Sequence, residues 1–288
     1  MRIAIMTDTN SGISADEGRA LSIHVLPMPV IVGDKDFLEG VDITHQELYQ
    51  AMTRGVPVRT SQPAAGDVLD FWDRLLKEYD SVIYIPMSGG LSGSTQVARQ
   101  LAGDYGDRVQ VVDNRRISVT LRSSVLEAKA LADRGLGPQE IREALEAAGR
   151  NSSIYIAVNS LEYLKKSGRV TPAGAAVAAV LNLKPVLTIQ GDKLDAFARA
   201  RGMEAARQTM LEAVKKDLET RFSGAPRDKV RIGAAGSFQE KEKAEGWLRQ
   251  VREAFPECET FYGPLSCSIA CHVGADAVGI GICPRIDE

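Results

Sequence analysis

The sequence has no long apolar run. Its 288 residues contain no apolar stretch near the roughly 18 residues that a membrane-spanning helix needs. Residues 2–6 have the pattern of a strand directly after Met1, so the apolar core of a signal peptide is missing as well. Both absences lead us to expect a cytoplasmic protein without a membrane-spanning helix.

A strong charge of either sign is also missing. The formal net charge is −3, which gives no electrostatic reason to expect binding to nucleic acid or to an anionic membrane surface. Hydrophobic residues make up 44% and charged residues 25% of the chain, as in ordinary soluble globular proteins. A chain of 288 residues can bury a sizeable core and more often forms two domains than one.

Cysteine is scarce and confined to one end of the chain. All 4 cysteines lie between Cys258 and Cys283. The segment Cys267-x-x-x-Cys271-His272 has some likeness to a metal cluster, but zinc sites favour more closely spaced pairs and need four ligands. The apolar neighbours favour small buried thiols instead, and disulfides are rare in the cytosol. We therefore expect no metal, no other cofactor and no disulfide.

Nucleotide-binding and hydrolase motifs are absent too. The glycine-rich stretch at residues 81–96 fits neither GxGxxG nor GxxxxGK[ST], and no lysine follows it to neutralise a polyphosphate. The segment Gly90-Leu-Ser-Gly93 lacks one spacer residue of the Gly-x-Ser-x-Gly nucleophile elbow. We therefore expect no catalytic activity from this chain alone.

The same stretch does contain the pattern of an anion site. An apolar run at residues 82–85 predicts a buried strand, and glycines and hydroxyl residues at 88–95 precede a helical pattern. Such a loop presents backbone N–H groups and short hydroxyl donors at a helix N-terminus, which favours an anion. Without a nearby lysine, a carboxylate fits the loop better than a polyphosphate. The alternative is a well-capped connection that binds no ligand.

The order of strand and helix patterns predicts an α/β fold. Residues 1–150 alternate between the two and predict a parallel sheet with helices on both faces, an α/β/α domain. Polar loops at residues 8–14, 60–63 and 88–95 fall at or near the carboxyl ends of its strands, where such sheets bind ligands. Residues 23–32 predict a strand that lies at an edge or carries an irregularity, because two prolines interrupt it.

The second half has a different pattern. Residues 151–288 mix helices with a hairpin signal at Gly191-Asp192, and they predict an α+β domain with a mixed, partly antiparallel sheet. Residues 173–181 predict a helix with unusually small side chains. Such a helix packs closely on a sheet, or it forms the wall of a narrow apolar tunnel. In the second interpretation the tunnel wall includes Ala176, Val177 and Val180.

Several segments together resemble the DegV family of fatty-acid-binding proteins, which serve as lipid-presenting subunits of bacterial fatty acid kinase. They follow one another in family order over nearly the whole chain, and none is specific when taken alone. These segments are Thr7-Asp-Thr-Asn-Ser-Gly-Ile13, Val25-Leu-Pro-Met-Pro-Val30, Thr60-Ser-Gln-Pro63, Leu91-Ser-Gly-Ser94, Leu164-Lys-Lys-Ser-Gly-Arg169, Leu181-Asn-Leu-Lys-Pro-Val-Leu187, Arg199-Ala-Arg201 and His272-Val-Gly274.

The resemblance implies one long-chain fatty acid buried between two domains. Residues 1–150 would carry the carboxylate-binding loops, and residues 151–288 would cover the acyl chain. The family's carboxylate-binding threonine and serine fall on Thr60 and Ser92, with Ser61 and Gly93 beside them. The family residues tied to phosphoryl transfer or kinase docking fall on Arg169, Arg201 and His272.

The sequence departs from the family pattern in two places. Gly89 stands where the family often has serine, in Ser88-Gly-Gly-Leu-Ser92. Ala275-Asp276 replaces the usual Pro-Gly after His272-Val-Gly274, which adds an acidic residue close to the histidine in sequence.

The leading hypothesis is a binding protein rather than an enzyme. It would take a long-chain fatty acid from the membrane by transient contact, bury the tail and present the carboxylate to a separate ATP-dependent kinase. Acyl-phosphate would form while the lipid stays bound. Two alternatives remain open: a lipid transport or signalling protein with no kinase partner, and a small-molecule kinase or hydrolase that uses the loop at residues 88–95.

Overall fold

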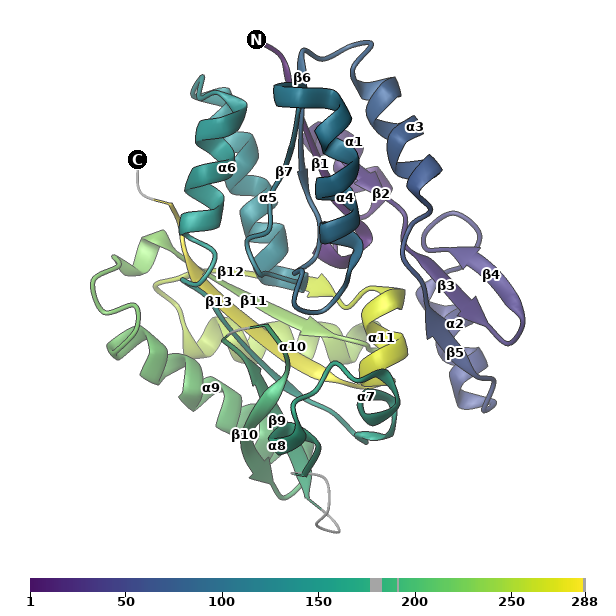
Figure 1. Ribbon diagram of the computed structural model, residues 1–288. Coiled ribbons are helices and arrows are strands. Elements are labelled where there is room, and N and C mark those ends of the chain that lie inside the picture. Colours follow the sequence, from purple (N-terminus) through teal and green to yellow (C-terminus); the bar gives the residue numbers. More distant parts are fainter. Residues whose placement is uncertain (177–182, 191, 287–288) are drawn as a thin grey trace.

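Three β-sheets organise the computed structural model, which describes residues 1–176, 183–190 and 192–286 (Figure 1). A four-stranded sheet has the order β2-β1-β6-β7, a six-stranded sheet has the order β10-β9-β8-β13-β11-β12, and a three-stranded sheet has the order β4-β3-β5. In Figure 1 the four-stranded sheet stands above the six-stranded sheet, and the three-stranded sheet lies to one side.

The elements alternate along the chain as follows. The strands are β1 (Ile3–Asp8), β2 (Ile23–Leu26), β3 (Pro29–Val32), β4 (Lys35–Leu38), β5 (Val58–Thr60), β6 (Ser81–Ile85), β7 (Val109–Val111), β8 (Ser153–Ala157), β9 (Lys184–Ile189), β10 (Asp195–Ala200), β11 (Val230–Gly236), β12 (Glu259–Pro264) and β13 (Val278–Pro284). The α-helices are α1 (Ala15–Leu21), α2 (His45–Thr53), α3 (Ala65–Leu75), α4 (Ser94–Ala102), α5 (Ser118–Asp133), α6 (Pro138–Ala147), α7 (Glu162–Ser167), α8 (Pro172–Ala176), α9 (Met203–Glu219), α10 (Lys241–Ala254) and α11 (Cys267–Val273). Short 3₁₀ turns are η1 (Thr9–Ser11), η2 (Gly103–Arg108) and η4 (Arg227–Lys229).

The four-stranded sheet is parallel and buried on both faces. Successive side chains point to opposite sides, so Ile5 and Ile83 pack with α5 and α6 while Met6 and Tyr84 pack with α3 and α4. Strands that are buried on both faces have nearly continuous apolar sequences, as β6 does. The predicted parallel α/β/α arrangement is therefore confirmed.

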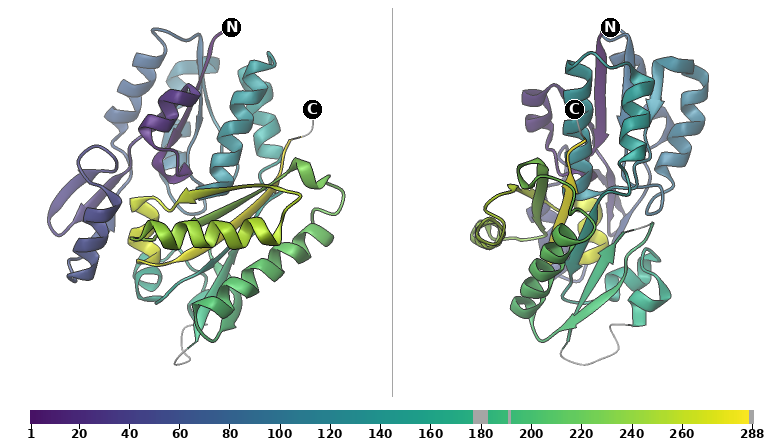
Figure 2. Two further views of the ribbon diagram at one scale, coloured as in Figure 1. Left: turned by 180° about the vertical axis from the view of Figure 1, so that it is seen from behind. Right: turned by 90° about the vertical axis from the view of Figure 1, so that its left-hand side faces the viewer.

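The six-stranded sheet is mixed. β13 runs antiparallel to both β8 and β11, β9 runs antiparallel to β8 and β10, and β12 is parallel to β11. Helices α9 and α10 cover one face of this sheet, as the left view of Figure 2 shows. The opposite face packs against α5, so residues from both halves of the chain share one core. The predicted mixed sheet and the β9–β10 hairpin are confirmed.

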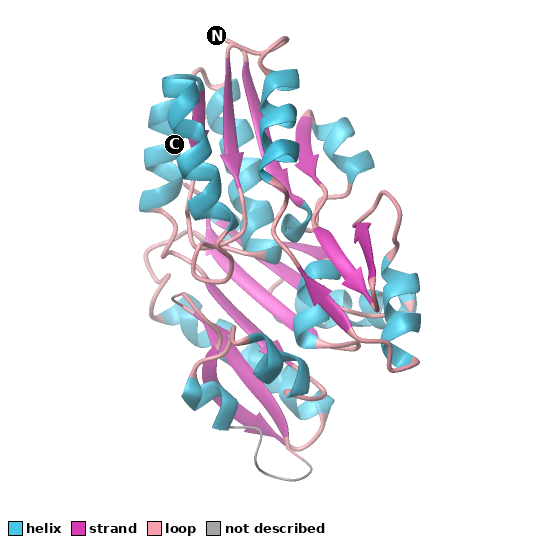
Figure 3. Ribbon diagram, turned by 45° about the vertical axis from the view of Figure 1, so that its right-hand side comes forward, coloured by secondary structure: helices cyan, strands magenta, loops and turns pink. Residues whose placement is uncertain are grey.

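The three-stranded sheet stands beside the other two (Figure 3), and the sequence patterns did not predict it as a separate sheet. The strand expected over residues 23–32 is divided at Pro27 and Met28 into β2 and β3. β2 forms the edge of the parallel sheet, and β3 pairs antiparallel with β4 and β5. The predicted irregularity is confirmed, because proline supplies no N–H for a continuous ladder. The edge position holds for β2, whereas β3 is the central strand of its sheet.

Among the described residues, no helix combines the length and the apolar character that crossing a membrane requires.

Candidate functional site

An apolar cavity lies where α5 and α11 meet the six-stranded sheet. Its volume is about 70 Å³, and almost all of the surface around it is carbon. Met87 and Leu91, which follow β6, also contribute to it. The remaining lining residues are Ile117, Ser118, Val119, Ile154, Ile156, Arg169, Ile189, Leu194, Ala235, Leu265, Ser268, Ile269, His272, Val273, Gly279 and Ile280. The lining suits a ligand that is mostly hydrocarbon.

Polar groups gather where this cavity meets an outer cleft. Arg169 and His272 line both spaces, and the outer cleft is also bordered by Thr60 and Tyr163. The Thr60 hydroxyl Oγ1 lies 3.0 Å from His272 Nε2. Strand pairing fixes the position of Thr60, which is the last residue of β5 and pairs with Val30 on β3. His272 comes from α11, near the other end of the chain. The sequence predicted both residues, and the structure brings them into contact.

Burial controls the charge of His272. Loss of water around the imidazole lowers its pKa from 6.5 to about 4, and the positive charge of Arg169 lowers it further in the same direction. The ring is therefore neutral near pH 7, with one nitrogen as donor and the other as acceptor. A neutral imidazole and a hydroxyl in contact can together offer a hydrogen bond to a carboxylate without placing a fixed charge beside it.

The loop at residues 88–95 is held by bonds within itself and to neighbouring segments. The Ser92 hydroxyl donates to Ser94 Oγ (3.0 Å) and accepts from the Ser94 N–H (3.2 Å). Arg169 Nε donates to the carbonyl of Leu91 (3.4 Å), so the arginine touches the same loop. A Cβ on Gly93 would lie 2.6 Å from Gln62 Nε2, which brings this loop against the one that follows β5. Ser92 and Thr60 therefore lie on adjacent loops.

The glycine departure at this loop has a steric reason. A Cβ on Gly89 would lie 2.6 Å from Asp113 Oδ2, while the Gly89 N–H donates to Asp113 Oδ1 at 3.2 Å. A Cβ on Gly90 would lie 2.4 Å from the carbonyl oxygen of Asp192, in the turn between β9 and β10. Asp192 also pairs with Arg115 at 2.9 Å. Gly89 thus allows close approach of the Asp113 segment, and Gly90 allows close approach of a turn from the second half of the chain.

Other residues singled out by the sequence lie elsewhere. Ser61 borders a separate surface groove. Arg201 is exposed after β10 and forms no hydrogen bond or ion pair within the described chain. Ala176 is exposed at the end of α8 and is not among the described residues that line the cavity; Val177 and Val180 lie outside the described residues.

The added acidic residue, Asp276, is used away from His272. Its carboxylate pairs with Lys243 Nζ at 3.3 Å, and its N–H donates to the carbonyl of Ser237. The charge of His272 is set by burial and by Arg169 instead. This departure from the family pattern therefore leaves the neutral state of His272 in place.

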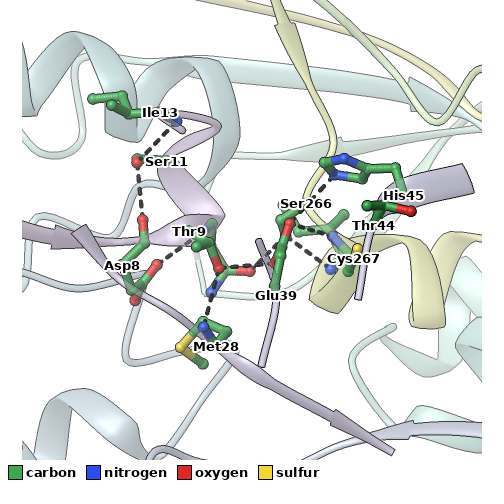
Figure 4. A network of polar contacts seen from close by, with 12 residues as sticks. Asp8, Thr9, Ser11, Ile13, Met28, Glu39, Thr44, His45, Ser266 and Cys267 are labelled. Carbon is green, nitrogen blue, oxygen red and sulfur yellow. Dashed lines mark hydrogen bonds and ion pairs between the residues drawn. The ribbon is translucent and has the colours of Figure 1, made fainter. Parts of the chain in front are cut away.

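A buried polar network fixes α11, and the sequence patterns did not indicate it (Figure 4). Ser266 caps the helix by accepting from the N–H of Ile269, and its hydroxyl donates to Asn10 Oδ1 at 2.8 Å. Asn10 Nδ2 in turn lies 3.1 Å from Met87 Sδ, at the cavity wall. Asn10 therefore connects the first loop to α11.

Glu39 makes a second connection to the same helix. One carboxylate oxygen accepts from the N–H of Cys267 (2.7 Å), and the other accepts from the Thr9 hydroxyl (2.8 Å), as Figure 4 shows. His45 Nε2 lies 3.3 Å from the first oxygen. Glu39, His45 and Cys267 offer ligand atoms within 4.8 Å of one another, as a metal site would. Because both carboxylate oxygens already accept from α11 and η1, we interpret the cluster as a helix anchor.

Asp8 is the last residue of β1, and the first loop begins there. Its two carboxylate oxygens accept from the N–H groups of Asn10 (2.9 Å) and Met87 (3.0 Å). Burial raises its pKa from 3.8 to about 6, although these two backbone bonds oppose the rise. Its buried position between two loops suits a role in holding them together.

Comparison with known proteins finds one family throughout the chain. The sequence profile described as "Uncharacterised protein, DegV family" matches residues 2–285. A DegV domain-containing protein of Staphylococcus aureus is 31% identical over 294 residues, which cover 99% of this chain and 98% of that protein. A DegV domain-containing protein of Deinococcus radiodurans is 30% identical over 217 residues, or 75% of this chain and 77% of that protein.

Solved structures have the same fold. A DegV family protein from Thermus thermophilus, described by its fatty acid binding, superimposes with a TM-score of 0.87 at 30% identity and covers 99% of this chain and 100% of its own. A stearic-acid-binding protein from Eubacterium ventriosum gives a TM-score of 0.88 at 22% identity, with 99% and 98% of the two chains covered. The second likeness shows the fold alone.

Proposed function

The chain belongs to the DegV family, and on this premise we propose that it binds one long-chain fatty acid and presents the carboxylate to a separate ATP-dependent kinase. The tail would occupy the apolar cavity, and the head group would lie at its mouth beside Thr60 and His272. The observation that carries the proposal is this juxtaposition of a hydrocarbon-lined cavity with neutral hydrogen-bond donors at one end.

The energetics favour such a ligand. Each methylene that leaves water contributes about 0.8 kcal/mol, so a long acyl chain gains on the order of 10 kcal/mol before ordering costs. A buried carboxylate without partners would cancel several kcal/mol of that gain. Thr60 and the neutral His272 are suitable partners. The fatty acid binding of the Thermus thermophilus relative supports a fatty acid as the ligand.

We assign the carboxylate to Thr60 and Ser92, with the backbone at Ser61 and Gly93 beside them. Ser92 is engaged with Ser94, so its hydroxyl would have to exchange that partner for the ligand. Neutral donors hold a carboxylate without locking it in an ion pair, which leaves an oxygen free to attack a phosphoryl group. Binding and reactivity would then be compatible.

Arg169, Arg201 and His272 are the proposed residues for phosphoryl transfer and for docking of the kinase. Arg169 lies at the boundary between cavity and outer cleft, where it could stabilise charge that develops on a transferred phosphoryl group. Arg201 is exposed and available to an acidic patch of a partner. The sequence carries no nucleotide-binding motif, so ATP and the catalytic metal would belong to the kinase. Transfer of lipid from a membrane would require transient contact with its surface.

Two measurements test the proposal. Denaturing extraction and mass spectrometry of the purified protein should release a long-chain fatty acid in about one copy per chain. Absence of lipid, together with no uptake of added fatty acid, would overturn the proposal as a whole.

The kinase step is tested separately. Lipid-loaded protein with its cognate kinase and ATP should yield acyl-phosphate, and Arg201→Ala should abolish that product while the lipid stays bound. If the loaded wild type is never phosphorylated, the protein is instead a lipid carrier without a kinase. Turnover of ATP by the chain alone would favour an enzyme.

A further inference from the structure

The first turn of α5 lines the cavity through Ser118 and Val119. Val119 is packed into a socket of glycines from three neighbouring strands of the six-stranded sheet. A Cβ would lie 2.4 Å from Val119 if placed on Gly233, 2.7 Å if placed on Gly281, and 3.0 Å if placed on Gly263. Val119 therefore leaves no room for a side chain at these three glycine positions. The valine is therefore closely packed against the sheet on this side.

The glycine socket around Val119 lies away from the polar mouth. Gly279 lies on the same face of β13 as Gly281, two residues earlier. The nearest atom to a Cβ on Gly279 would be 3.5 Å away, so the strand is less crowded there. α11, which carries His272, leads into β13 at Val278. Gly281 lies three residues further along the strand, or about 10 Å at 3.3 Å per residue. Residues beside Val119 therefore face the middle or far part of a bound chain.

Ser118 introduces a polar group at this end. It lines the cavity, is only 5% exposed, and its buried hydroxyl has no hydrogen-bond partner among the described residues. An unpaired buried hydroxyl is unfavourable, because it has lost its hydrogen bonds to water. Ser118 also has a φ of +55°, in the left-handed region that side chains rarely adopt. Two unfavourable features at one residue call for a compensating role.

The position of Ser118 in the helix strengthens this argument. It is the first residue of α5, a 16-residue helix whose preceding residue provides no side-chain cap. The N–H groups of a first turn have no partner within the helix, and they carry a partial positive charge. Hydroxyl and helix end together favour an oxygen atom that accepts hydrogen bonds. A plain hydrocarbon chain offers no such atom.

We propose that Ser118 and the first turn of α5 form a second polar site inside the cavity, which accepts an oxygen carried by the acyl chain away from its carboxylate. The preferred ligands would be fatty acids with a hydroxyl or keto group at mid-chain. The inference rests on the proposed function, because it concerns a second part of the same ligand.

The test compares three ligands by calorimetry: octadecanoic acid, the same acid with a hydroxyl at mid-chain, and the same acid with a hydroxyl on the carbon next to the carboxyl. The matched variants are Ser118→Ala and Ser123→Ala. Ser123 is equally buried on α5 but donates to the Val119 carbonyl at 3.0 Å and does not line the cavity. Alanine keeps a Cβ at position 118, so the backbone strain is unchanged.

In the wild type, the mid-chain hydroxy acid should bind at least as tightly as octadecanoic acid. Ser118→Ala should raise the ratio of its dissociation constant to that of octadecanoic acid about five- to tenfold, whereas Ser123→Ala should leave the ratio unchanged. The acid hydroxylated beside its carboxyl should show no such change. A ratio that moves less than twofold in Ser118→Ala would overturn the inference while the proposed function stands. If octadecanoic acid itself fails to bind, the proposed function fails instead.

The ligand-free proteins give an independent readout. Removing an unpaired buried hydroxyl should leave the melting temperature of Ser118→Ala equal to or above that of the wild type. Removing the bonded hydroxyl in Ser123→Ala should lower it. A melting temperature of Ser118→Ala that falls as far as that of Ser123→Ala would show that the Ser118 hydroxyl already has a structural partner, and would also contradict the inference.

Discussion

Burial of His272 makes stability depend on pH. The pKa of its imidazole falls from 6.5 to about 4 in the folded protein, so the unfolded chain binds a proton over a range where the folded state does not. This difference costs stability as the pH falls from about 6.5 toward 4. Between pH 7 and pH 5 the wild type should therefore lose about 2 kcal/mol more than His272→Gln, as measured by urea denaturation at each pH.

Asp8 acts in the opposite direction. Its pKa is raised from 3.8 to about 6, so the folded state binds a proton more tightly than the unfolded chain does. Its contribution is fully present below pH 3.8 and is lost as the pH rises through about 6. Acidification should then stabilise His272→Gln until other carboxylates become protonated, while the two effects partly cancel in the wild type. Parallel pH profiles for both proteins would show that His272 is not held neutral.

The proposed head-group site gives a second prediction at the residue scale. Thr60→Ala combined with Ser92→Ala should weaken fatty acid binding by about 2–3 kcal/mol, on the scale of hydrogen bonds to a charged group. Thr60 should account for most of the loss, because it contacts His272 whereas Ser92 is bonded to Ser94. Thr60→Ser keeps the hydroxyl and should restore most of the affinity in a titration. Undiminished binding in the double variant would exclude this head-group assignment.

At the scale of elements, α11 depends on its buried cap. Ser266 is 2% exposed, accepts from the N–H of Ile269 and donates to Asn10, so Ser266→Ala removes a cap and leaves Asn10 Oδ1 unpaired. We expect a loss of about 3 kcal/mol in the free energy of unfolding. Ser14 is the matched control, since it caps α1 in the same way but is exposed.

Ser14→Ala should cost only about 1 kcal/mol by the same chemical denaturation. Because α11 carries His272 and part of the cavity lining, Ser266→Ala should also weaken fatty acid binding, whereas Ser14→Ala should not. Equal losses of stability in the two variants would mean that the network from Asn10 to Ser266 adds nothing beyond an ordinary helix cap.

At the scale of the whole molecule, close packing between the two halves depends on glycine. A Cβ on Gly90 would lie 2.4 Å from the Asp192 carbonyl oxygen, which is backbone and cannot rotate away. Gly90→Ala should therefore separate the loop at residues 88–95 from the β9–β10 turn. The expected effects are a loss of about 1–3 kcal/mol in stability and weaker fatty acid binding.

Gly103→Ala provides the control, because a Cβ there has no neighbour within 4 Å and its φ of −55° suits any residue. This variant should be neutral or slightly stabilising, since alanine restricts the unfolded chain. Thermal unfolding and lipid titration of both variants distinguish the outcomes. If Gly90→Ala matches Gly103→Ala in both assays, the contact with Asp192 does not hold the two halves together.

The sequence by itself determined what depends on local periodicity and on short motifs. The parallel sheet followed from the alternation of strands and helices, because a strand buried on both faces needs a continuous apolar run such as β6. The loops at residues 8–14 and 88–95 could be located for the same reason, since they follow β1 and β6. The prediction was wrong for residues 60–63, which follow β5 of the antiparallel three-stranded sheet. Thr60 and His272 were identified from family motifs, with no information on the distance between them.

Only the tertiary structure decided which distant residues meet. The contact of Thr60 with His272 joins positions 212 residues apart, and the glycine socket around Val119 depends on the register of three strands. α11 escaped the sequence patterns because it is buried on nearly every side and so shows no amphipathic period. No sequence motif marks Glu39 or Ser118. Each matters because it is buried, Glu39 with hydrogen-bond partners and Ser118 without one among the described residues. The periodicity of a sequence indicates which face of a helix or strand is buried. Only tertiary packing determines which other element that face contacts.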